Sequence, residues 1–168
     1  MSLRGNRHWI WVSVDMPDTS AAATIRGLVD EHFRHTIAKQ ADAIVARYAQ
    51  SADTYVFVEG PRWSTTGIEK IETGWRAYVG APMAMMDFSW AEGPHVSVGG
   101  ELAWHAGIVD IDMLIRERPT RVRFRATHVL RRAADGEWRI EHEHFSVPAA
   151  DPYGIGDWLP ATSSSMSA

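Results

Sequence analysis

The stretch DGEWRIEHEHFS, residues 135–146, decides how the rest of the chain is interpreted. It begins with Asp135-Gly136, a pair that favours a two-residue hairpin turn. Apolar and polar residues then alternate as in a β-strand, so one face carries Trp138, Ile140, His142, His144 and Ser146. The opposite face carries Arg139, Glu141, Glu143 and Phe145. The first face starts with an indole and ends with two imidazoles and a hydroxyl, which predicts a core surface that becomes a pocket wall.

Composition narrows the class of protein. The chain has 168 residues, of which 45% are hydrophobic, and this favours one domain with a sizeable core. The net charge of -4 gives no electrostatic attraction for nucleic acid or an anionic membrane. The absence of cysteine excludes disulfides, thiolate metal sites and cysteine nucleophiles. No apolar run approaches the roughly 20 residues of a membrane span, so we expect a cytoplasmic protein that binds neither nucleic acid nor membrane.

The order of the remaining elements predicts an α+β domain. An apolar stripe with helical spacing runs from residue 18 to 48, with a break near 39–42, and a second helix is expected over 67–78. A short strand at 54–58 lies between them, and long strands at 83–98, 101–115 and 121–132 precede the hairpin. Gly93-Pro94 marks a bulge or bend. Helices followed by a meander of antiparallel strands indicate an α+β layer.

Both ends are interpreted separately from this domain, which is placed at 19–148. Residues 1–18 are interpreted as an extension, either a tag or disordered, with a short edge strand at 9–14 as the alternative. Residues 149–168 are interpreted as a tail.

The element order, Leu130-Arg131-Arg132 and the stretch at 135–146 resemble the SnoaL-like branch of the NTF2-like superfamily. The closing motif also resembles the association domain of the calmodulin-dependent kinases. The resemblance covers residues 21–148 and implies a cone: a strongly bent antiparallel sheet wrapped around the N-terminal helices. It also implies an apolar cavity open at one end, and commonly a homodimer through the outer sheet face. Isomerases, dehydratases, cyclases, transport factors and assembly hubs share this fold, so function must come from the site.

The ketosteroid isomerases of this superfamily provide a direct test. Their Val-Glu-Asp-Pro loop, which carries the general base, corresponds here to Val58-Glu59-Gly60-Pro61, with Gly60 at the base position. Their protonated aspartate corresponds to Thr127 or a neighbour, and their oxyanion-hole tyrosine corresponds to a position near Phe33. The resemblance therefore does not extend to that catalytic machinery.

The predicted site depends on the hairpin register. A two-residue turn sets Val129 opposite His142, Thr127 opposite His144 and Arg125 opposite Ser146, whereas a three-residue loop would bring His128 to the histidine face. We favour the first register. His144 and His142 are then acid/base candidates, and Arg125, Thr127 and Ser146 are ligand-binding candidates. An arginine there suits a carboxylate or enolate end of a ligand. The alternative is that Arg125 pairs with a core carboxylate such as Asp87 and the histidines are simply hydrogen-bonded.

Aromatic side chains supply the expected pocket wall. Alternation puts Phe88 and Trp90 on one strand face together with Met86, and Trp104 follows on the next strand. Core packing is the alternative role for these residues. Trp63 lies in a polar loop, so we place it at the cavity mouth.

Other histidines and acids have simpler interpretations. His32 and His35, one helical turn apart, are interpreted as a core-edge and a surface histidine. His142 and His144 with His128 or His105 would give three imidazoles for a metal, but no carboxylate is clearly on that face. We therefore expect no metal and no cofactor. Glu141 and Glu143 are expected on a solvated or dimer-forming sheet surface.

Two hypotheses for function follow. The first is a homodimeric SnoaL-like protein that binds a small apolar or aromatic ligand with an anionic end, as a cyclase, dehydratase or isomerase. The second is a non-catalytic ligand-binding or oligomer-assembly module.

Overall fold

The computed structural model describes residues 19–58 and 62–149, together with residues 151, 154 and 156. The expected extension at 1–18, its alternative strand at 9–14, Gly60 and most of the tail lie outside the described residues. Predictions about them stay predictions.

The N-terminal apolar stripe forms two helices, α1 (Thr19–Ile37) and α2 (Ala41–Val45). The helix is interrupted between them, close to the predicted position, where Lys39 has a φ of 52°. One face of α1 is buried at Ile25, Leu28, Val29, His32, Phe33 and Thr36, as its spacing predicts. The third helix, α3 (Ile68–Val79), follows a Gly67 with a φ of 93°. Among the described residues, no helix is both long and apolar enough to cross a membrane.

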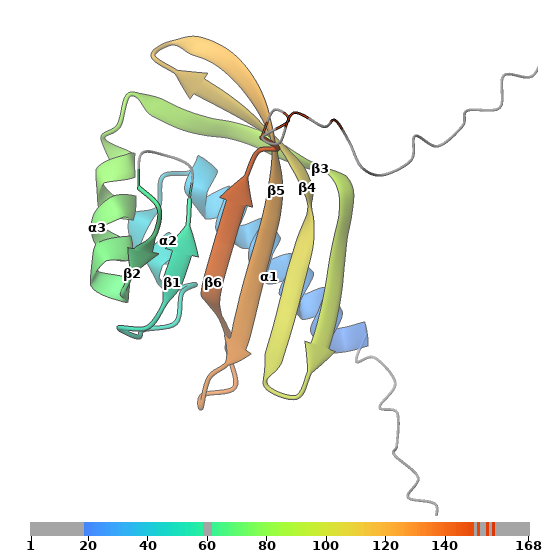
Figure 1. The fold of residues 1–168 in the computed structure, drawn as a ribbon. Coiled ribbons are helices and arrows are strands. Elements are labelled where there is room, and N and C mark those ends of the chain that lie inside the picture. Colours follow the sequence, from blue (N-terminus) through green and yellow to red (C-terminus); the bar gives the residue numbers. More distant parts are fainter. Residues whose placement is uncertain (1–18, 59–61, 150, 152–153, 155, 157–168) are drawn as a thin grey trace, which may run out of the picture.

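In the part of the chain that the structure describes, the other main component of the fold is a bent six-stranded sheet. Its strands are β1 (Tyr55–Phe57), β2 (Thr65–Thr66), β3 (Met83–Gly99), β4 (Leu102–Ile115), β5 (Arg118–Arg132) and β6 (Trp138–Ser146). They lie in the order β2-β1-β6-β5-β4-β3, and every pair is antiparallel except β1 with β6. The sheet curves around α1, and α3 lies beside β1 and β2 (Figure 1). The predicted α+β fold with a bent sheet around the N-terminal helices is confirmed.

The turn that opens β6 differs from the predicted two-residue turn. The backbone N–H of Gly136 donates to the carbonyl of Ala133 at 2.8 Å, and that of Ala133 donates to the carbonyl of Glu137 at 2.8 Å. These bonds close a three-residue loop. Further along, Leu130 pairs with Ile140 but Val129 pairs with His142, so Glu141 is the extra residue of a β-bulge. The loop and the bulge each shift the register by one residue, in opposite directions, so the two shifts cancel beyond the bulge. The predicted pairs of Thr127 with His144 and Arg125 with Ser146 therefore form.

The same bulge reverses the predicted faces of β6. Trp138 and Ile140 are buried as expected, but beyond Glu141 the inward residues are Glu143, which is 1% exposed, and Phe145. His142, His144 and Ser146 lie on the outer face. The placement of the two histidines in the pocket wall is wrong, and so is the placement of Glu143 on the outer surface. Strict alternation does not hold across a bulge.

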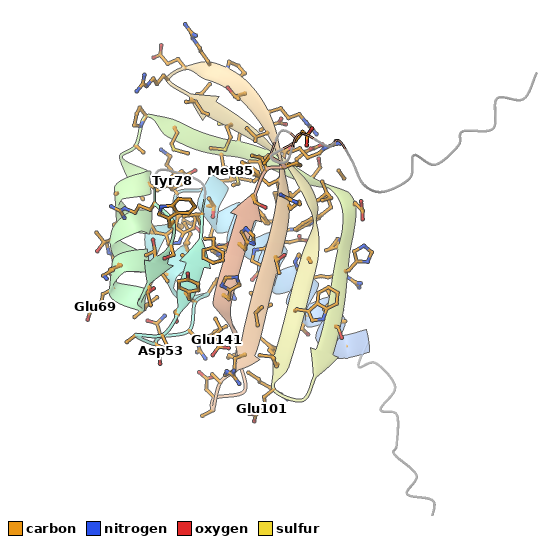
Figure 2. All side chains as sticks on the ribbon, viewed as in Figure 1. Asp53, Glu69, Tyr78, Met85, Glu101 and Glu141 are labelled. Atoms are coloured by element: carbon orange, nitrogen blue, oxygen red, sulfur yellow. The ribbon has the colours of Figure 1, made fainter. Side chains whose placement is uncertain are left out.

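A second bulge has the same effect in β3. The register shifts between Met85 and Asp87, so Met85 packs with Phe88 and Trp90 against the core while Met86 is 57% exposed. Further shifts on either side of Glu92 fall beside Gly93-Pro94, as predicted. The backbone N–H of Met85 donates to the hydroxyl of Tyr78 at 2.9 Å, which ties β3 to the last turn of α3 (Figure 2).

Candidate functional site

A cavity of about 640 Å³ lies between α1, α3 and the inner face of the sheet. Most of its wall is aliphatic, aromatic or thioether in character. These apolar residues include Phe33, Val56, Ile71, Met83, Met85, Ile111, Met113, Phe124 and Phe145. Three methionines in one wall give a surface that can adapt to ligands of irregular shape.

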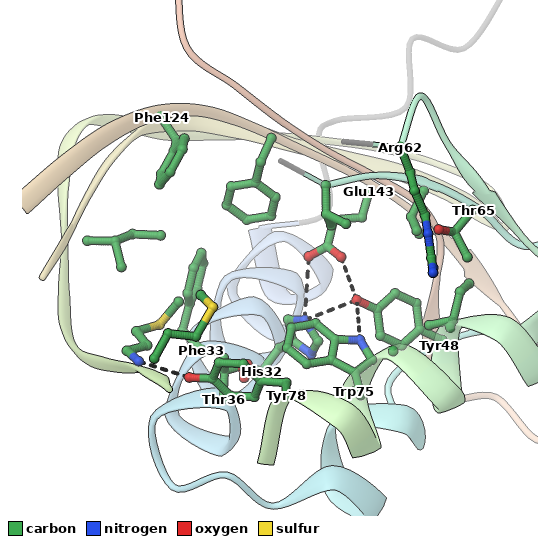
Figure 3. Close-up of a pocket in the computed structure, with 18 of the residues that line it drawn as sticks. His32, Phe33, Thr36, Tyr48, Arg62, Thr65, Trp75, Tyr78, Phe124 and Glu143 are labelled. Carbon is green, nitrogen blue, oxygen red and sulfur yellow. Dashed lines mark hydrogen bonds and ion pairs between the residues drawn. The ribbon is translucent and has the colours of Figure 1, made fainter. Parts of the chain in front are cut away.

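Among the described residues of this wall, one carboxylate interrupts the apolar surface. Glu143 of β6 accepts a short hydrogen bond at Oε2 from the hydroxyl of Tyr48. The indole Nε1 of Trp75 donates to the same hydroxyl at 3.2 Å (Figure 3). His32 Nε2 lies 3.4 Å from Glu143 Oε1 and 3.4 Å from the Tyr48 hydroxyl oxygen. On the far side, His128 Nε2 lies 3.3 Å from Oε1, within ion-pair distance although it makes no hydrogen bond.

The surroundings of Glu143 keep it ionised. Burial by itself raises the pKa of this carboxyl, but the imidazoles of His128 and His32 outweigh burial and hold the pKa well below its usual range. Burial, followed by the negative charge of Glu143, raises the pKa of the Tyr48 hydroxyl. Tyr48 therefore remains a donor and Glu143 an acceptor near neutral pH.

The Nδ1 atom of His32 has no hydrogen-bond partner among the described residues, although it is buried. His32 lines the cavity, and its other nitrogen faces Glu143 and Tyr48. When Nε2 carries the proton toward the carboxylate, Nδ1 keeps a free lone pair.

A further imidazole lies behind the wall. The ring of His105 packs 5.2 Å from that of His128 and 5.0 Å from that of Trp90, and it is fully buried. Neither of its nitrogens has a partner among the described residues. Burial, with a smaller contribution from the charge of His128, lowers the pKa of His105 to about 3. His105 is therefore neutral.

Polar residues gather where the cavity meets solvent. Arg62 and Ser64 precede β2, Thr65 lies in it, and Lys70 lies in the first turn of α3. Arg62 and Lys70 are exposed, whereas Glu143, His32 and Tyr48 are buried. The cavity thus has a cationic rim and an anionic floor.

The predicted site residues lie elsewhere. None of the nine is among the described residues that line the cavity. Five lie on the outer sheet face: His142, His144, Arg125, Thr127 and Ser146.

Contacts on that outer face are local. His142 Nδ1 is 2.7 Å from the carbonyl oxygen of Tyr55, and both histidine rings pack on Phe57. Partial burial, followed by the charges of His142 and Arg125, lowers the pKa of His144. Arg125 donates to the carbonyl of Val147 at 3.1 Å instead of pairing with Asp87.

The four predicted aromatic residues also miss the cavity. Phe88 stacks on Phe33 at 4.7 Å, and Trp90 Nε1 donates to Asp30 at 3.1 Å, so both have the core role that was the alternative. Trp104 is 45% exposed on the outer face. Trp63 is 96% exposed, and its neighbours Arg62 and Ser64 line the cavity in its place.

Sequence reasoning missed Glu143, Tyr48 and Trp75, and it gave His32 only a packing role. One signal was present. Phe145 fell on the face that was expected to be solvated, and a large apolar residue there indicates a bulge upstream.

The histidines do not converge on a metal. His105 and His128 lie inside the sheet, and His142 and His144 lie outside it. Across the described ranges there is no group of three or more histidine, aspartate or glutamate side chains with the geometry to hold a metal ion.

Solved structures with this architecture are described as NTF2-like. An NTF2-like protein of unknown function from Pseudomonas putida KT2440 is 25% identical, with a TM-score of 0.67 over 79% of this chain and 90% of that chain. An NTF2-like superfamily protein from Salmonella enterica has a TM-score of 0.70 at 17% identity, covering 83% and 99%. A putative calcium/calmodulin-dependent kinase II association domain from Thiobacillus denitrificans has a TM-score of 0.59 at 23% identity, covering 74% and 94%.

A match to a family model identifies this chain more specifically than its fold does. Residues 25–150 match the model of the SnoaL-like domain, and the chain belongs to that family. The predicted resemblance is thereby confirmed. No curated protein matches this sequence.

Proposed function

We propose that this SnoaL-like protein binds a small apolar molecule in the cavity and converts it by acid–base chemistry, as an isomerase, dehydratase or cyclase. Family membership supports a small-molecule-binding or isomerase-like fold. The finer assignment depends on one observation: Glu143, a carboxylate that is 1% exposed, meets His32 and Tyr48 on the wall of a mostly apolar cavity.

Stability alone gives little reason for these charges. Replacing a buried ion pair with well-packed apolar residues is often neutral or stabilising. Ionisable groups with perturbed pKa values inside a cavity are, in contrast, common in functional sites. The cluster is therefore better explained by chemistry than by packing.

His32 takes the role of general base in this proposal. A carboxylate with a lowered pKa is a weak base, so Glu143 acts by orienting His32 and by stabilising the imidazolium. The proton leaves a C–H or O–H group of the ligand and moves to Nδ1 of His32. It returns to another ligand atom in an isomerisation, or to a departing hydroxyl in a dehydration. Tyr48 holds the carboxylate in place by its hydrogen bond, and Trp75 in turn orients the Tyr48 hydroxyl.

The test is hydrogen–deuterium exchange in deuterated buffer, followed by NMR, over a panel of cyclic and aromatic ketones. Exchange of the protons next to the carbonyl reports proton abstraction without knowledge of the final product. We expect catalysed exchange, reduced by about 10²- to 10⁴-fold in His32→Gln. Glu143→Gln is a second variant with nearly unchanged shape and should also slow exchange. His144→Gln, on the outer face, is the matched control and should exchange as the wild type does.

Exchange that is unaffected in a folded His32→Gln variant would contradict the proposed base. Binding of panel compounds without catalysed exchange would favour the alternative, a non-catalytic ligand-binding module.

We also propose a homodimer through the outer sheet face. Leu102, Trp104 and Tyr55 are 44%, 45% and 37% exposed there, and the ring of Phe57 contacts those of His142 and His144 edge to face on the same surface. An apolar, aromatic strip on a sheet is suited to burial against a second copy.

A further inference from the structure

The rim of the cavity carries two cations that make no ion pair with any described residue. Arg62 and Lys70 are both exposed and both line the cavity. Arg76, on the same helix as Lys70, pairs instead with Asp42 and Glu72. Arg62 extends beside Thr65 on the side of the cavity where Tyr48 lies (Figure 3). The hydroxyls of Ser64 and Thr65 add hydrogen-bonding groups to the same rim.

The two ends of the cavity carry opposite charges. Glu143 at the floor is ionised, and it repels an anion placed beside it in a medium of low polarity. A ligand anion is therefore favoured at the rim, where two positive charges are available, and disfavoured at the floor. The floor favours a hydrogen-bond donor, because a carboxylate accepts and cannot donate.

We infer that the ligand of this cavity is an amphipathic anion: an apolar cyclic or aromatic body with a carboxylate held at Arg62 and Lys70 and a hydroxyl directed toward Glu143. The inference rests on the proposed function of the cavity and specifies its substrate class. It moves the anionic end expected from the sequence from Arg125, on the outer face, to the rim. Arg62 can bind a carboxylate with two parallel hydrogen bonds, and Lys70 contributes a point charge.

The rim is tested with two fluorescent probes that share one apolar body. 8-Anilinonaphthalene-1-sulfonate carries an anionic group, and N-phenyl-1-naphthylamine is the same ring system without it. We expect the wild type to bind the sulfonate about tenfold more tightly, and added salt to reduce the difference. Arg62→Gln combined with Lys70→Gln should abolish this preference and leave the affinity for the neutral probe unchanged. Arg34→Gln, which removes an exposed cation of α1 that does not line the cavity, is the matched control and should keep the preference.

A third variant separates this inference from the proposed function. Gly74 of α3 lines the cavity, and a Cβ built there meets nothing within 4 Å, so Gly74→Phe adds a phenyl group at the cavity wall without a clash at Cβ and should obstruct binding in the cavity. Loss of both probes in this variant supports binding in the cavity. Equal binding of both probes by the wild type, or a preference that persists in the double variant, overturns the rim inference alone. Binding of both probes that survives Gly74→Phe places them outside the cavity and contradicts the proposed function as well.

Discussion

At the scale of the residue, burial of the Glu143 carboxylate demands compensation. Moving an isolated ion from water into the interior costs several kcal/mol, and attraction to an opposite charge rarely offsets that cost unless hydrogen bonds are also formed. Here one oxygen is satisfied by Tyr48, and the other faces the imidazoles of His32 and His128. These partners come from α1, the segment after α2, and β5, so the site depends on the whole domain being folded.

His105 gives a prediction about pH at this scale. Its pKa is lowered from 6.5 to about 3, so between these pH values the ring is protonated in the unfolded chain and neutral in the folded chain. The stability contributed by the neutral ring is present above pH 6.5 and is lost as the pH falls toward 3. The loss is about 2 kcal/mol by pH 5. His105→Leu should remove this part of the pH dependence and leave stability at neutral pH similar, because neither ring nitrogen has a described partner.

Urea unfolding of both proteins at pH 7.5 and pH 5 measures the effect. If the wild type and His105→Leu lose equal stability between these values, the ring takes up its proton inside the folded protein, and the prediction is wrong.

At the scale of the element, the bulge in β6 determines which side chains reach the cavity. Glu141 and His142 together oppose Val129, so both point outward, and alternation restarts with Glu143 inward. The outward Glu141 pairs with Arg131 at 2.9 Å across the strands. The bulge thus places a glutamate inside and two histidines outside.

Deletion of Glu141 tests this account. Without it, Ile140, Glu143 and Phe145 would still face inward by plain alternation, and the register set by the three-residue loop would continue unbroken. We expect a folded protein that retains cavity binding. Loss of the exposed Arg131–Glu141 pair should change stability little, because solvent screens exposed ion pairs.

Deletion of Thr127 is the control, because this residue lies in β5 at similar depth where no bulge is present. The Thr127 deletion would shift the residues on one side of this position by one place, so that their buried side chains would point outward. This should prevent stable folding. Thermal unfolding followed by near-ultraviolet circular dichroism compares the two deletions. Similar damage from both would contradict the role assigned to the bulge.

At the scale of the whole molecule, the sequence predicted the architecture but not the site. Apolar spacing located α1, the break before α2, and α3, because helix periodicity is local. Plain alternation predicted the wrong face for the second half of β6, since the three-residue loop and the bulge cancel in register but not in orientation, and only Phe145 marked the bulge. The cluster of Glu143, His32 and Tyr48 joins positions far apart in the chain, and no local pattern marks such contacts.

The proposed homodimer is the prediction that belongs to this scale. A stable interface buries about 800 Å² on each partner, and the outer sheet face offers Trp104, Leu102 and Tyr55 for this purpose. We expect sedimentation of the wild type as a dimer at micromolar concentration, and Trp104→Glu should shift it to monomer because a charge would be buried at the interface. Trp63→Glu is the matched control: Trp63 is 96% exposed but lies in the loop before β2, so this variant should remain dimeric. A monomeric wild type, or equal dissociation of both variants, would reject this interface. Both variants should still bind N-phenyl-1-naphthylamine, because the cavity lies on the opposite face of the sheet.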